Sequence, residues 1–210
     1  MSHDELRALE ARWRETKSVS DEAAWLRRRV ELGDLTQERL ELAASCAHPA
    51  AERACGIMSA SAAPGLEEMT RNLAGFAEPA RPVALVAARC VSSIGVDGLD
   101  RPPEALTRAV AAILEYERCP CESHRSGLFV LSSQLGRLAA TRLGGNDPRL
   151  GQAVKAAYHH CLAINHAAKA KADQALEQLN KGLGEARRAG LDEAKLAAAV
   201  RAGLLDWALG

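Results

Sequence analysis

Residues 18–47 constrain the fold of this chain more than any other stretch. Ser18 can cap a helix, with Asp21 at capping-box spacing, and the apolar residues that follow recur at every third or fourth position. Gly33 supplies a left-handed stop, and Asp34 opens the next helix at once. A turn this short permits only antiparallel packing of its two helices. The sequence therefore predicts a helical hairpin here.

The rest of the chain repeats this pattern, and the composition agrees with it. Hydrophobic residues make up 48% of the chain but aromatic residues only 3%, so alanine and leucine carry the apolar content. Residues that favour strands are scarce. We therefore expect an all-α fold of about ten or eleven antiparallel helices, arranged as a bundle or an irregular α-solenoid. The stretch 82–94 is apolar on most sides, which predicts a central, buried helix.

Breaks between the predicted helices suggest how the chain is organised. Pro49 and Asp147-Pro148 are typical of helix starts, and the small residues of 57–65 are typical of an exposed connection. At 210 residues the chain can form a single all-α domain. An alternative division has an N-terminal helical-hairpin lobe at 1–56 and a main helical bundle at 66–210.

Charge and hydropathy exclude several classes of partner. The chain carries 27 basic and 27 acidic residues, interspersed along the predicted helices, whereas a nucleic-acid-binding module is expected to show a basic excess. No uncharged stretch is long enough for a membrane span, and the N-terminus is charged from its fourth residue, unlike a secretory signal. We therefore expect a cytoplasmic protein whose six cysteines are reduced thiols.

The most distinctive local feature is the segment CPCESH at 119–124. Cys119, Cys121 and His124 are soft ligands suited to zinc, and the proline between the cysteines breaks the helix so that the three side chains could converge. A fourth ligand would come from the helix that carries His159, His160 and Cys161. If this helix is antiparallel to the one before it, the geometry favours His166 instead.

Other interpretations of the same residues remain open. Cys121 near a helix N-terminus would have a lowered pKa, which suggests a thiol redox site. Cys121 or Cys161 paired with a histidine could also act as a nucleophile. The simplest alternative is a helix junction with two small, partly buried thiols. His159 and His160 point about 100° apart on a helix, so we expect only one of them to face the core.

No catalytic residue and no cofactor apart from zinc is predicted. The chain lacks the glycine-rich phosphate and dinucleotide motifs, the H-E-x-x-H zinc motif and the G-x-S-x-G nucleophile elbow.

Three segments carry a resemblance to a known group of proteins. They are ALVAARCV at 84–91, DRPPEAL at 100–106 and QAVKAAYHHCLAINHAAKAKA at 152–172. On these segments, residues 82–173 resemble small all-helical bacterial proteins that are predicted to be immunity partners of polymorphic toxins. The resemblance implies a protein that binds and blocks a toxin and has no catalysis of its own. The N-terminal hairpin lies outside it, and the segment 119–124 departs from the pattern.

Taken together, these features predict a non-catalytic helical module for protein–protein interaction, either an adaptor or a toxin-neutralising protein of the immunity type. Its partner is expected to be another protein. Trp25, Arg28 and Arg29 are the expected exposed anchors, because Trp and Arg dominate interface hot spots. The alternatives are a zinc-binding protein that uses Cys119, Cys121 and His124, and a thiol redox enzyme.

Overall fold

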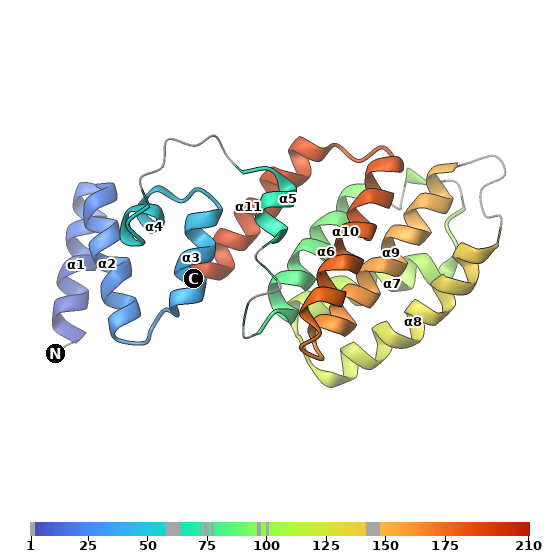
Figure 1. The fold of residues 1–210 in the computed structure, drawn as a ribbon, viewed down its shortest axis with the longest axis horizontal. Coiled ribbons are helices and arrows are strands. Elements are labelled where there is room, and N and C mark those ends of the chain that lie inside the picture. Colours follow the sequence, from blue (N-terminus) through green and yellow to red (C-terminus); the bar gives the residue numbers. More distant parts are fainter. Residues whose placement is uncertain are drawn as a thin grey trace. The chain divides into compact units, whose positions relative to one another are not determined.

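The computed structural model describes residues 3–57, 64–71, 73, 76, 78–95, 98–99, 101–141 and 148–210. In this part of the chain, all regular secondary structure is helical (Figure 1). No strand is found in these ranges, which confirms the predicted all-α fold. The helices are α1 (His3–Thr16), α2 (Val19–Glu31), α3 (Gln37–Ser45), α4 (Pro49–Ala54), α5 (Leu66–Arg71), α6 (Ala80–Ile94), α7 (Glu104–Arg118), α8 (Glu122–Ala140), α9 (Pro148–Ala167), α10 (Ala172–Arg188) and α11 (Glu193–Leu209). Within the described ranges, no helix combines the length and the apolar character that a membrane span requires.

The chain divides into two compact units, and the smaller one is built from two separate segments. It consists of Met1–Met69 together with Arg201–Gly210, whereas the larger unit is Thr70–Val200. The first prediction was a single domain, and its alternative, a division into 1–56 and 66–210, differs from these units because it places residues 201–210 in the main bundle. Most of the predicted connection at 57–65 lies outside the described residues.

Both helices of the predicted hairpin form in the smaller unit, but they pack more on α4 than on each other, and the second begins later than expected. The Ser18 side chain accepts a hydrogen bond from the backbone N–H of Ser20 at the start of α2, and Gly33 adopts a left-handed φ of 78°. The next helix begins at Gln37 rather than at Asp34, because the Thr36 side chain caps it by accepting from the backbone N–H of Arg39. The longer turn allows Leu35 to bury its side chain.

The C-terminal half of α11 completes the smaller unit through arginine contacts. The Arg201 guanidinium donates hydrogen bonds to the carbonyl oxygens of Cys46 and Ala47, at 2.6 and 2.9 Å. Arg39 donates to the Trp207 carbonyl oxygen, and its guanidinium lies 5.3 Å from the centroid of the Trp207 ring. These bonds satisfy carbonyl groups at the ends of α3 and α11 that have no partner within their helices.

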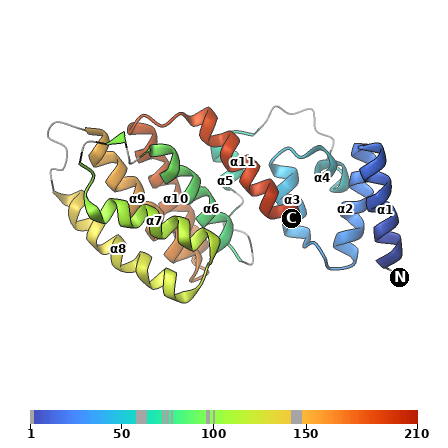
Figure 2. The same ribbon diagram turned by 180° about the vertical axis from the view of Figure 1, so that it is seen from behind.

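The larger unit is organised around α9. This helix packs against α6, α7, α8 and α10, whereas α6 packs against α7, α9 and α10 (Figures 1 and 2). The predicted central helix is therefore buried as expected, but α9 contacts more of its neighbours. Alanines on α9 allow this close approach, because their side chains add little bulk between helices. The fully buried ones include Ala153, Ala156, Ala157 and Ala163.

The two ends of α9 are set by local sequence. Pro148 is the first residue of the helix, as predicted, whereas Asp147 lies outside the described residues. The helix does not continue into α10. Ala170 adopts a left-handed φ of 53°, and the backbone N–H of Lys171 bonds to the His166 carbonyl oxygen at 2.9 Å, which closes the last turn.

A buried histidine lies where α9 packs against α10. The His160 side chain has no solvent exposure, and neither ring nitrogen has a hydrogen-bond partner among the described residues. Burial lowers the pKa of His160 to about 3. The ring lies against Gly182 of α10, where an added methyl group would be 2.6 to 2.9 Å from its atoms. Only one of the two adjacent histidines is fully buried, as predicted: His159 is partly exposed, and its Nδ1 lies 2.8 Å from the amide oxygen of Gln178, which is also on α10.

Candidate metal centre

The two cysteines of the segment 119–124 lie on either side of a helix break. Cys119 ends α7, with its backbone N–H bonded to the Glu115 carbonyl oxygen, and Cys121 is the N-terminal cap residue of α8. Pro120 causes the break, because a proline disfavours helical backbone in the residue before it. The chain turns back immediately, and the backbone N–H of Cys121 donates to the Cys119 carbonyl oxygen at 2.8 Å.

This turn brings together three side chains that can bind a metal. The ligand atoms of Cys119, Cys121 and His124 all lie within 4.8 Å of one another. Cys121 Sγ is 3.3 Å from His124 Nδ1, and the same nitrogen is 2.9 Å from the Cys119 carbonyl oxygen. His124 reaches Cys121 because residues three apart share one face of the first turn of α8. Both cysteines are solvent-exposed, so an ion or an oxidant can reach them.

The three groups have different proton affinities. The pKa of Cys121 is lowered, first by the backbone N–H of His124 at the start of α8 and also by the Cys119 thiol. The pKa of Cys119 is raised, because its thiol donates a hydrogen bond to Cys121. The pKa of His124 is raised by its hydrogen bond to the Cys119 carbonyl oxygen. The arrangement therefore favours the thiolate on Cys121 over that on Cys119, and it favours the protonated form of His124.

The fourth expected ligand does not join this group. His166 lies near the end of α9, where burial lowers its pKa. The residues of α9 and the following turn that approach the start of α8 are Ala167, Ala168 and Ala170. Because consecutive helical residues point about 100° apart, His166 faces a different direction from Ala167. The structure thus brings together three of the four predicted ligands and leaves one coordination position without a protein ligand among the described residues.

The remaining cysteines are poor candidates for chemistry. Cys46, Cys90 and Cys161 are buried, and burial raises their pKa values to about 11, 12 and 12 respectively. Burial also raises the pKa of Cys55. Since the thiolate is the reactive form, a nucleophile at Cys161 is not supported. Cys121 is the cysteine with a lowered pKa among those described.

The expected partner-binding anchors are engaged within the chain. Arg28 is only 6% exposed and forms ion pairs with Glu5 and Glu31, at 2.7 and 2.6 Å. Trp25 stacks on Trp13 with ring centroids 4.8 Å apart. Arg29 lies over the Trp25 ring and donates to the Leu209 carbonyl oxygen. The expected exposure is therefore wrong for Arg28, whereas Trp25 and Arg29 are half-buried, and a role of the three in partner binding stays a prediction.

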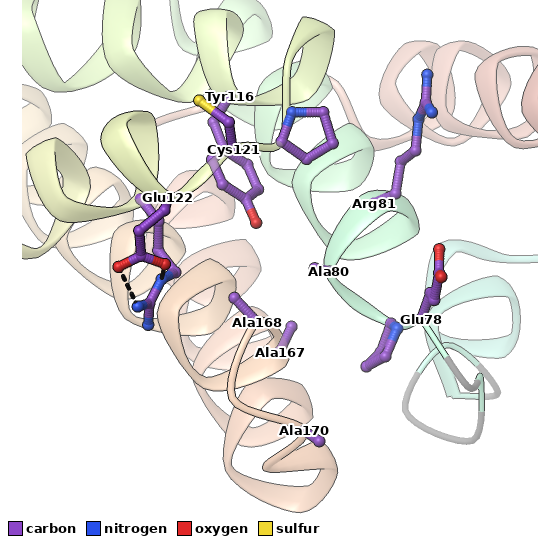
Figure 3. Close-up of a pocket in the computed structure, with 12 residues that line it drawn as sticks. Glu78, Ala80, Arg81, Tyr116, Cys121, Glu122, Ala167, Ala168 and Ala170 are labelled. Atoms are coloured by element: carbon purple, nitrogen blue, oxygen red, sulfur yellow. Dashed lines mark hydrogen bonds and ion pairs between the residues drawn. The ribbon is translucent and has the colours of Figure 1, made fainter.

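A pocket of about 380 Å³ adjoins the helix break and was not expected from the sequence. Its walls come from the start of α6, the α7–α8 junction and the end of α9. Figure 3 shows the Tyr116 hydroxyl directed into the space bounded by Ala80, Ala167 and Ala168, whereas the Cys121 sulfur is directed away from it. Arg125 and Glu122 form an ion pair at one side, with Nε and Oε2 2.8 Å apart. Tyr116 and Arg125 are close to the cysteines in sequence, but Ala80 and Ala167 are far from them, so the sequence alone does not show that these residues line one pocket.

Comparisons with known proteins supply no family assignment. No protein family, curated protein or solved structure matches this chain.

Proposed function

We propose that this protein binds a thiophilic divalent cation, Zn²⁺ in the first place, at Cys119, Cys121 and His124. The observation that carries the proposal is the convergence of the ligand atoms of two thiols and one imidazole within 4.8 Å at the start of α8. Two thiolates and an imidazole are ligands that zinc favours, and three protein ligands leave a position for water or another molecule. A cytoplasmic, reducing setting belongs to this proposal, since both thiols must stay reduced.

The distances fit such an ion after small side-chain movements. Ligand atoms bound to one tetrahedral zinc lie roughly 3.5 to 3.8 Å apart, given ordinary Zn–S and Zn–N bond lengths. The Cys121–His124 distance of 3.3 Å is already close to this range. Binding through Nδ1 requires His124 to give up its hydrogen bond to the Cys119 carbonyl oxygen. The protons on Cys119 and His124 must also leave, so binding should release protons.

Zinc titration of the purified chain should show one bound ion, with affinity at least about 100-fold weaker in the Cys119→Ser/Cys121→Ser variant. Cys55→Ser is the matched control, because Cys55 is partly accessible but lies outside the cluster. Affinity should also fall about tenfold per pH unit for each proton released between pH 7.5 and 6. Competition with a chromophoric chelator measures both effects. Equal affinity in the double variant and the control, or no zinc binding, would refute the site.

A thiol redox centre at the same residues has weaker support. The lowered pKa of Cys121 and its exposure favour reaction with an oxidant. However, the one-residue spacing between Cys119 and Cys121 makes a strain-free disulfide between them difficult. We therefore place metal binding first.

We also propose the non-catalytic interaction function, of the adaptor or toxin-neutralising kind, and locate its surface on α8. Phe129 and Val130 are 56% and 54% exposed in the middle of this helix. Large apolar side chains next to each other on a surface are typical of sites that bind another protein. Lys169 lies 5.7 Å from the Phe129 ring centroid, which places a positive charge at the edge of this surface. The expected partner is a protein with an apolar patch.

Replacing Phe129 and Val130 by serine should weaken binding of the native partner by about 30-fold, the usual effect of removing an interface hot spot. The test is affinity capture from the native cell, followed by a binding measurement with the partner recovered in stoichiometric amount. Ile57→Ser is the control, because Ile57 is similarly exposed but lies elsewhere in the chain. If the double variant retains the partner as well as the control does, the surface on α8 is not the interface.

A further inference from the structure

The pocket beside the helix break has an uncapped helix N-terminus in its wall. Helix α6 begins at Ala80, and its cap residue Pro79 makes no side-chain hydrogen bond to it. The first backbone N–H to find a carbonyl partner is that of Val83, which bonds to the Pro79 oxygen at 3.1 Å. Pro82 has no N–H, so Ala80 and Arg81 supply the free donors of the first turn. Such a terminus carries partial positive charge and favours an anion.

A second observation on a different helix points to a ligand in the same space. Tyr116 is only 3% exposed, yet its hydroxyl forms no hydrogen bond with any described residue. Figure 3 shows this hydroxyl directed into the pocket. The rest of the side chain is packed, but the hydroxyl oxygen itself reaches the open pocket, so a ligand group that accepts its hydrogen bond would take the place of water there. Burial raises the pKa of Tyr116, which keeps the hydroxyl protonated and able to donate.

The charged residues of the lining leave an arginine available to an anion. Glu122 is paired with Arg125, and this pairing lowers the pKa of the Glu122 carboxyl group. Arg81, in the first turn of α6, is exposed and forms no ion pair with a described residue. Glu78 also borders the pocket and is exposed, as Arg81 is, so water screens both of these charges. Figure 3 shows the Arg81 side chain extended away from the space that the Tyr116 hydroxyl enters, so its guanidinium must turn to reach an anion there. The donors of the α6 terminus and Tyr116 lie at this space without such a movement, and they favour negative charge in it.

We propose that this pocket is a binding site for a small organic carboxylate. The carboxylate would accept hydrogen bonds from the backbone N–H groups of Ala80 and Arg81, from the Arg81 side chain and from the Tyr116 hydroxyl. The apolar part of the ligand would lie against small side chains of the lining, which are Pro79, Pro120, Ala167, Ala168 and Ala170. A volume of about 380 Å³ accommodates a molecule of this size. The site is separate from the metal proposal, because it uses neither thiol.

Benzoate is a suitable probe, with benzamide as its uncharged analogue of nearly the same shape. We expect benzoate to give saturable shifts of the Ala80 and Arg81 amide signals in ¹H–¹⁵N spectra of the full chain. Both Tyr116→Phe and Arg81→Gln should weaken benzoate binding about tenfold or more, since each removes a hydrogen bond to a charged group. Arg89→Gln is the control, because Arg89 is exposed on the same helix but does not line the pocket. A chelator in all samples removes any metal that could bind the carboxylate instead.

Three results would overturn the carboxylate site. The first is the absence of saturable benzoate shifts at Ala80 and Arg81. The second is equal affinity for benzamide, which would show that negative charge is not recognised. The third is unchanged benzoate affinity in Tyr116→Phe and Arg81→Gln when both variants give native-like spectra. Conversely, benzoate binding that the two variants lose and Arg89→Gln keeps supports the site even if the chain binds no zinc.

Discussion

Gly182→Ala is expected to lower the free energy of unfolding by roughly 1–3 kcal/mol, in the range of overpacked core substitutions. The new methyl group would lie 2.6, 2.8 and 2.9 Å from three ring atoms of His160. That ring cannot move away easily, because it is fully buried between α9 and α10. The two helices would have to separate, which weakens the largest packing interface of the larger unit. Urea denaturation monitored by circular dichroism measures the loss.

The same helix supplies a matched control. Gly184 lies two residues away on α10, and a methyl group added there meets nothing within 4 Å. Gly184→Ala should therefore raise stability by up to about 1 kcal/mol, because alanine favours the helix. Adding His160→Ala to Gly182→Ala should recover part of the loss by emptying the space. Similar effects of the two glycine substitutions would show that contact with His160 does not limit residue 182.

Acidification from pH 6.5 to pH 4 should destabilise the protein by roughly 3 kcal/mol through His160 alone. The pKa of His160 is lowered from 6.5 to about 3 by burial. Between these values the unfolded chain binds a proton at this residue and the folded chain does not, so stability falls as the pH falls. The effect is absent above the unfolded pKa, where His160 is neutral in both states.

Urea denaturation at pH 7 and pH 4.5 isolates this contribution when the wild-type chain is compared with His160→Leu. The variant keeps an apolar side chain against Gly182 but cannot be protonated, so its stability should depend less on pH. Burial also lowers the pKa values of His48 and His166, but the wild-type chain and His160→Leu both contain these histidines, so their effect cancels in the comparison. His159→Leu is the control, because His159 is its partly exposed neighbour. Parallel pH profiles of wild type and His160→Leu would exclude the buried histidine as the cause.

Local sequence was sufficient for most of the fold. Pro148 and Gly33 predict a helix start and a helix end through backbone geometry alone, and both lie where expected. The start of α3 was misplaced because Asp34 and Thr36 are both good capping residues, and the burial of Leu35 decides between them. The assignment of residues 201–210 to the smaller unit depends on contacts of Arg201 with Cys46 and Ala47. Sequence periodicity carries no information about such distant contacts.

Some features of the candidate site can likewise be predicted from the local sequence, and others cannot. Cys119, Cys121 and His124 lie within one turn of chain, so their spacing was enough to predict that they meet. The position of His166 depends on which face α9 turns toward α8, and this is decided by packing of the whole unit. Arg28 illustrates a similar limit. It is expected from the sequence to be an exposed anchor, but it is buried and Glu5 of α1 pairs with it. The carboxylate pocket was missed because its walls come from three distant segments.

The interleaved connection of the two units has a consequence for the order of events on the ribosome. Residues 70–200 are all translated between the two segments of the smaller unit. The larger unit can therefore fold during synthesis before residues 201–210, the second segment of the smaller unit, have been made. Until residue 201 leaves the exit tunnel, the carbonyl groups of Cys46 and Ala47 lack their guanidinium donor. We therefore expect the larger unit to complete its fold before the smaller one, the reverse of the usual order in which N-terminal domains fold first.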